Sequence, residues 1–197
     1  MDFHPVTSGE MVVGGSTSDT GITSSSVAAE VPLPLAVYIR EGGAYLWRKY
    51  FYGMGHDFIS AIKFLNNNGA KIIAAFSSSE ANTKNANLLF ATLNPSNGDI
   101  IKTYSYAPPS SAYSNPRIKP GALLYEYEDP SEDVYVAGQF ELKWTFFKFS
   151  TSTTPPVSPN FYYTLGASAY SKAYAVEIDR ANSRLFVSGQ YDNSASA

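Results

Sequence analysis

A four-part pattern of short apolar runs recurs along the chain and constrains its fold more than any other feature. Between Phe58 and Tyr106 the runs are FISAIKFL, KIIAAFS, NLLFATL and IIKTYSY, with polar segments between them. They are rich in Val, Ile, Tyr and Phe and are bounded by Gly, Pro, Asn and Ser, which are signals of β-strands and turns. Phe58, Ile62 and Leu65 also fit a helical stripe, but alignment with the other units favours a strand.

The pattern repeats before and after this unit. Runs similar to KIIAAFS start at Met11 (MVVGGST), Val134 (VYVAGQF) and Leu185 (LFVSGQY), and the other runs recur between them in a constant order. Repeats of ~40–50 residues with four strands each are typical of a β-propeller, in which every blade is a twisted sheet packed face to face on the next. The sequence therefore predicts an all-β, propeller-like array of four-stranded antiparallel blades.

We expect a single partial propeller over residues 1–197, with blade 1 at about 1–53, blade 2 at about 54–107, blade 3 at about 108–166 and a half blade 4 at about 167–197. The first strand of blade 1 is at best the short DFHPVT. About three and a half blades are fewer than the four or more of a closed ring. We therefore expect either a fragment of a larger propeller or a last sheet that another chain completes, because the strand Leu185 to Tyr191 would otherwise be an exposed edge.

The stretch from Leu88 to Tyr106, LLFATLNPSNGDIIKTYSY, together with Trp47 and Gly53 of the first unit, resembles the bacterial-type β-propeller repeat families. WD-repeat signatures are missing, and the double glycine of kelch repeats occurs once, at Gly14-Gly15. These families have scaffold and surface roles more often than a shared activity. The resemblance therefore implies an architecture and carries no active site with it.

Composition excludes several function classes. The chain has 14 Lys and Arg against 17 Asp and Glu, and no basic block is longer than Arg48-Lys49, which argues against binding to a nucleic acid backbone. The absence of cysteine removes disulfides, thiolate metal sites and thiol nucleophiles. No apolar run approaches the ~20 residues of a membrane span, and the amino terminus lacks the features of a signal peptide. No cofactor is implied, and the hydroxyl-rich, weakly charged composition favours an extracellular or cell-surface location.

Candidate binding residues follow from the expected loop arrangement. In an antiparallel blade the loops after the second and fourth strands lie at one end, and here they include the long segments Ser16 to Leu33, Ser77 to Ala86 and Ala107 to Pro120. Variable loops gathered on one face are where binding residues concentrate in repeat proteins. The candidates on that face are His56, Asp57, Tyr113 and Arg117.

Catalytic and metal sites are less well supported. A Ser/His/Asp triad would have to use His4 or His56, and no G-x-S-x-G elbow is present, so a chance pairing of loop residues is favoured. A glycan-active hydrolase or lyase using His56, Asp57 and Glu80 is the weakest alternative. Asp129 and Asp133 are calcium candidates within an acidic hairpin, although a solvated turn is favoured because no D-x-D-x-D-G loop occurs.

Tyrosine is unusually frequent, with 15 in the chain, and several lie in the expected fourth strands, including Tyr50 and Tyr104. They suit either sugar stacking and protein contact or packing between blades, and the second is favoured. We expect a non-enzymatic scaffold or protein-interaction module within a larger protein or assembly, bound to a protein partner or to further blades. The alternative is a carbohydrate-binding or cell-surface adhesion module.

Overall fold

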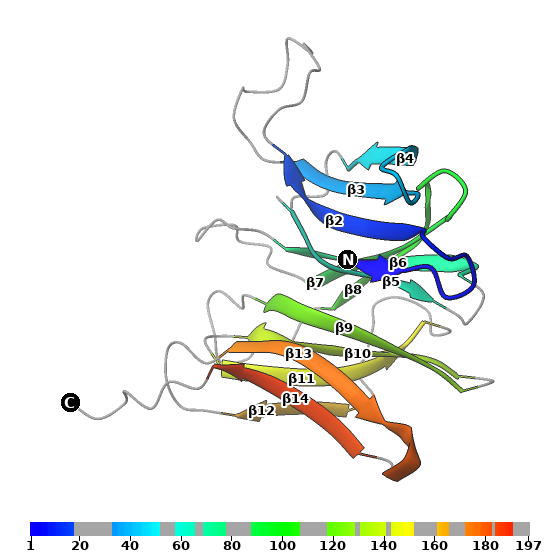
Figure 1. Ribbon diagram of the computed structural model, residues 1–197. Helices are drawn as coiled ribbons and strands as arrows, with labels where there is room; N and C mark the ends of the chain where they lie inside the picture. Colours follow the sequence, from blue (N-terminus) through cyan, green and yellow to red (C-terminus); the bar gives the residue numbers. More distant parts are fainter. Residues whose placement is uncertain are drawn as a thin grey trace.

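The computed structural model describes residues 1–17, 33–51, 58–65, 69–77, 88–106, 118–128, 131–140, 143–151, 161–165, 172–182 and 184–190 (Figure 1). Within these ranges the strands form antiparallel sheets, and the one helical element is a single 3-10 turn at Arg180–Asn182. The predicted all-β class and the antiparallel sheets are confirmed. None of the helices in the described ranges is long and apolar enough to cross a membrane.

The strands form four sheets, each made of consecutive strands. Sheet 1 contains β1 (Asp2–Phe3), β2 (Met11–Thr17), β3 (Leu33–Ile39) and β4 (Tyr45–Tyr50). Sheet 2 contains β5 (Phe58–Leu65), β6 (Lys71–Ser77), β7 (Leu88–Leu93) and β8 (Ile100–Tyr106). Sheet 3 contains β9 (Ile118–Glu128), β10 (Ser131–Phe140), β11 (Lys143–Ser150) and β12 (Phe161–Leu165). Sheet 4 is the pair β13 (Lys172–Asp179) and β14 (Arg184–Gln190).

The turn between β7 and β8 shows how local sequence sets these hairpins. The Asn94 side chain accepts a hydrogen bond from the Ser96 amide at 2.9 Å, and the Asn94 amide donates to the Asp99 carbonyl at 2.8 Å. Gly98 has a φ of 74°, in the left-handed region that favours glycine. Asn and Gly therefore close this turn for the physical reasons that made NPSNGD a turn signal in the sequence.

The sheets pack face to face in chain order, with β2 on β5, β5 on β9, and β9 on β13 (Figure 1). Sheet 2 is covered on both faces. Ile72, Ala74 and Phe76 belong to the core shared with sheet 1, whereas Ile73 and Ala75 belong to the core shared with sheet 3. This double burial explains why residues 72–76 (IIAAF) are continuously apolar rather than alternating.

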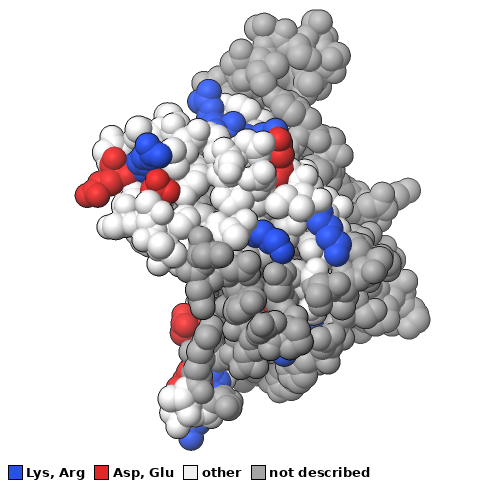
Figure 2. Space-filling view, turned by 90° about the vertical axis from the view of Figure 1, so that its right-hand side faces the viewer, with Lys and Arg blue, Asp and Glu red and all other residues white. Residues whose placement is uncertain are grey.

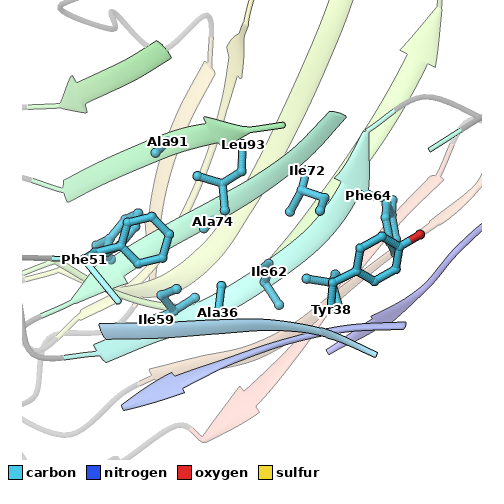
Figure 3. Packing of buried hydrophobic residues seen from close by; sticks show 12 residues of the cluster. Ala36, Tyr38, Phe51, Ile59, Ile62, Phe64, Ile72, Ala74, Ala91 and Leu93 are labelled. Atoms are coloured by element: carbon cyan, nitrogen blue, oxygen red, sulfur yellow. The ribbon is translucent and has the colours of Figure 1, made fainter. Parts of the chain in front are cut away.

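Figure 3 shows the core between sheets 1 and 2, where Ala36 and Tyr38 lie beside Ile59 and Ile62. The core between sheets 2 and 3 includes Phe90 and Phe149, whose ring centroids are 4.8 Å apart. A smaller core joins sheets 3 and 4 through four buried side chains, those of Ala137, Phe146, Ala173 and Val176.

The β7–β8 turn of sheet 2 also docks on β4 of sheet 1. The Trp47 indole donates a hydrogen bond to the Pro95 carbonyl at 2.6 Å, and Lys49 pairs with Asp99 at 2.5 Å. A Cβ atom on Gly98 would lie 2.8 Å from the Trp47 ring, so the glycine also permits this close approach. Contacts of β2 and of β4 thus fix sheet 1 on sheet 2.

Candidate interaction surface

Sheet 1 has an apolar face on the side turned away from sheet 2, called here the outer face of sheet 1. Val12, Ala36 and Tyr38 are buried against sheet 2, and side chains alternate along a strand, so their neighbours point the other way. Strand register places Val37 between Val13 and Arg48. The face is formed by Met11, Val13, Gly15, Leu35, Val37, Ile39, Tyr45, Arg48 and Tyr50, and every one of these residues is half-buried or exposed.

Arg48 is the one charged residue in this set. Its guanidinium carbon lies 5.5 Å from the centre of the Tyr50 ring, within the range of a cation–π contact. Tyr45, at the rim, is 68% exposed. An antiparallel sheet facing water on one side normally carries polar residues there, whereas this sheet is apolar on both faces, as sheet 2 is. The outer face of sheet 1 is therefore the strongest candidate for an interaction surface.

The other end of the stack is the outer face of sheet 4, formed by Tyr174, Ala175, Glu177, Asp179, Arg184, Phe186, Ser188 and Gln190. Ala173 and Val176 are buried on the opposite side, against sheet 3. Tyr174 is 49% exposed and Phe186 is 57% exposed. Among the described strands, β14 is hydrogen-bonded to β13 alone, so its second edge is unpaired there. Sheet 4 thus offers two aromatic side chains and an open edge.

A polar cluster fastens the β1–β2 turn to β3. The Tyr38 hydroxyl donates to Glu10 Oε2 at 2.5 Å, and Arg40 Nε donates to Glu10 Oε1 at 3.2 Å. The Tyr38 hydrogen bond lowers the pKa of Glu10, and Arg40 adds to this against the opposing effect of burial. Burial and the Glu10 carboxylate together raise the pKa of Tyr38. Because these groups satisfy one another, the cluster has a structural role.

His4 belongs to the same turn. Its Nδ1 accepts hydrogen bonds from the amides of Thr7, at 2.8 Å, and Val6, at 3.2 Å, which occupy the lone pair that a base or metal ligand needs. The ring packs edge-on against Phe64 with centroids 4.9 Å apart. A Cβ on Gly69 would collide with the ring. His4 therefore shapes the turn, in line with the weak catalytic case for it in the sequence.

The two candidate tyrosines have different positions. Tyr104 is 2% exposed, in the core between sheets 2 and 3, and its hydroxyl donates to the Thr151 carbonyl at 3.0 Å. It has no surface to offer a sugar or a partner, which removes it from the candidate binding residues. Tyr50 is half-buried on the outer face of sheet 1 and remains a candidate.

Asp133, a calcium candidate, is buried and pairs with Lys148 at 2.6 Å. Burial alone would lower the pKa of Lys148, but the hydrogen bond to Asp133 and the neighbouring Tyr135 outweigh it and raise that pKa. A lysine ammonium thus already occupies the place a metal ion would take beside this carboxylate. The described ranges contain no group of three or more His, Cys, Asp or Glu side chains that could hold a metal.

The remaining candidates, His56, Asp57, Glu80, Tyr113, Arg117 and Asp129, lie outside the described residues, as do most of the long loops. Figure 2 shows the side of the molecule that lies to the right in Figure 1, and its described surface there is mostly uncharged with scattered Lys, Arg, Asp and Glu side chains. The outer face of sheet 1 was not identified from the sequence. The apolar residues that neighbour Val13 and Val37 were the sequence feature that indicated it. No protein-family model matches the chain, and no curated protein shows significant similarity to it.

Proposed function

We propose that the chain is a non-enzymatic, propeller-type scaffold that binds protein through the sheets at the ends of its stack. The observation that carries this proposal is the outer face of sheet 1, which has the apolar composition of a face between sheets but is half-buried or exposed. Burial of such a face against a partner sheet is favourable at roughly 25 cal/mol for each Å² of apolar surface removed from water. A sheet with a polar outer face would gain no such free energy from association.

The propeller architecture is part of this proposal. Three sheets of four consecutive strands, packed on one another through β2, β5 and β9, support a series of blades. Among the described strands such a series leaves two faces without a neighbouring blade, one at each end, and these are the outer faces of sheets 1 and 4. Further blades or a partner chain would cover them, which agrees with a role inside a larger protein or assembly.

Carbohydrate binding is the second candidate, because Tyr45 and Tyr50 lie on the outer face of sheet 1 together with Arg48. Aromatic rings beside a polar group are a usual composition for sugar stacking. The two functions differ in what they need from the face. Protein docking uses its aliphatic centre around Val37, whereas sugar binding uses the tyrosines at its rim.

The test is binding of a hydrophobic fluorescent dye to dilute protein, compared between wild type and Val37→Glu. We expect wild type to bind the dye and Val37→Glu to lose most of that signal while it stays folded by circular dichroism. Ile101→Glu is the matched control, because Ile101 is 55% exposed but lies on sheet 2. Absence of dye binding in wild type, or glycan-array binding that Tyr50→Ala abolishes, would overturn the scaffold proposal.

A further inference from the structure

We infer that the outer face of sheet 1 in one copy of the chain packs on the outer face of sheet 4 in a second copy. This inference rests on the proposed function and names its partner. Within one chain the same relation already occurs three times, because each sheet packs on the next through β2 on β5, β5 on β9 and β9 on β13. A contact from sheet 4 to sheet 1 of another copy continues that series by one step.

The two faces are complementary in chemistry. The outer face of sheet 1 has an aliphatic centre, and the outer face of sheet 4 presents Tyr174 and Phe186, which are exposed aromatic side chains suited to cover it. Aromatic side chains are enriched in the cores of protein interfaces. Each chain therefore carries both of the faces that an apolar contact between copies needs, one on sheet 1 and the other on sheet 4.

Charge selects the head-to-tail arrangement over the symmetric ones. Arg48 is the one charged residue on the outer face of sheet 1, whereas the outer face of sheet 4 carries Glu177 and Asp179 against Arg184 and is therefore net negative. Two copies of sheet 1 face to face would bring two positive faces together, and two copies of sheet 4 would bring two net negative faces together. Like charges at an interface are unfavourable, while Arg48 against Glu177 is favourable.

A head-to-tail contact is heterologous, because it joins two different surfaces. The assembly that it forms depends on whether the rotation from one copy to the next closes into a ring. If the rotation between copies closes, two or more chains form a ring in which no end face remains open. If it does not close, the contacts continue into a filament. Both outcomes cover the outer faces of sheets 1 and 4 at every internal junction.

Disulfide trapping tests the inference directly, because the chain has no cysteine and each variant carries a single thiol. Val13→Cys places the thiol on the outer face of sheet 1, and Ser188→Cys places it on the outer face of sheet 4; both substitutions are close in size to the native residue. Under mild oxidation we expect the equimolar mixture to give several-fold more disulfide dimer than either variant alone. Ser96→Cys, in the exposed β7–β8 turn, measures random collision.

Sedimentation velocity with charge-swapped variants provides the second measurement. We expect Arg48→Glu and Glu177→Arg each to weaken self-association about tenfold or more, and a chain carrying both substitutions to recover it. A monomeric wild type at all concentrations, or a mixed-thiol yield no higher than that of Ser96→Cys, would overturn the second-copy inference. If the dye still binds at Val37 in that case, the scaffold proposal stands with another partner; if it does not, the proposal itself fails.

Discussion

The inner and outer faces of sheet 1 come from the same strands, yet only the inner face is fitted to a neighbour. On the inner face Val12, Gly14 and Ala36 let β5 approach closely, and a Cβ on Gly14 would lie 2.5 Å from Ile59 Cγ2. On the outer face Gly15 has nothing within 4 Å of the place its Cβ would take. The residues beside it there are branched and larger, among them Val13, Leu35 and Val37.

This difference shows that apolar composition and steric fit are separate properties of a sheet face. The inner face combines both, since its side chains interdigitate with sheet 2 as protein cores do. The outer face has the composition alone within one chain. A partner would therefore have to supply the complementary shape, and substitutions should be tolerated very differently on the two sides.

The largest effect is expected from Gly14→Ala. The new methyl group would collide with Ile59, and overpacking of this kind typically costs about 1–3 kcal/mol. The matched control is Gly15→Ala, which we expect to leave the free energy of unfolding unchanged or to raise it slightly, because space is open and the unfolded chain loses entropy. Urea denaturation measures both. Equal losses for the two variants would show that the faces do not differ in fit.

Tyr38→Phe should cost about 1–2 kcal/mol, because it removes a hydrogen bond to a carboxylate whose second oxygen pairs with Arg40. Tyr45→Phe, on the exposed rim of the other face, is the control and should have no effect. The acid dependence should also change. The lowered pKa of Glu10 contributes stability that is present above its ordinary pKa of 4.5 and is lost as the pH falls through the lower folded value.

Thermal unfolding between pH 2 and pH 7 measures this dependence. The decline of stability in acid should be shallower in Tyr38→Phe than in wild type, because the largest cause of the lowered pKa is gone. Parallel curves for the two proteins would contradict the assigned role of this hydrogen bond.

Val37→Glu and Val37→Lys test the strand register on the outer face of sheet 1. Val37 pairs with Arg48 across β3 and β4, so a glutamate would face an opposite charge and a lysine a like charge. We expect Val37→Glu to be the more stable variant by about 0.2–1 kcal/mol. Adding 0.5 M NaCl in a chemical denaturation series should shrink the difference. If the lysine variant is the more stable of the two, the register on this face is wrong.

The smallest effect is expected for Lys49→Gln on the inner side. Lys49 and Asp99 are both substantially exposed, so their ion pair is worth about 0.2–1 kcal/mol at most and should weaken with salt. Arg48→Gln, one residue away on the opposite face, should leave the stability of the monomer unchanged. Denaturation midpoints measured at low and at high salt distinguish Lys49→Gln from Arg48→Gln.

The strands and their grouping into sheets were predictable from sequence, because each run is short, β-prone and followed by turn residues such as Asn94 and Gly98. The burial and the contacts of individual side chains could not be predicted from the sequence. Tyr50 and Tyr104 look alike in the sequence, but one lies on an end sheet and the other between two sheets. The pairing of Asp133 with Lys148 depends on the register of β10 and β11, which the spacing of runs does not specify.

The chain order of the strands within each sheet has a consequence for folding. Every strand pairs with a sequence neighbour, so each sheet can form from hairpins that close on the microsecond scale, without waiting for distant segments to meet. The sheets then act as coupled units in a one-dimensional series, each held in place by its neighbours. The two-stranded unit β13–β14 has one described neighbour and the fewest strands, and it should be the first part of the chain to open in native-state hydrogen exchange.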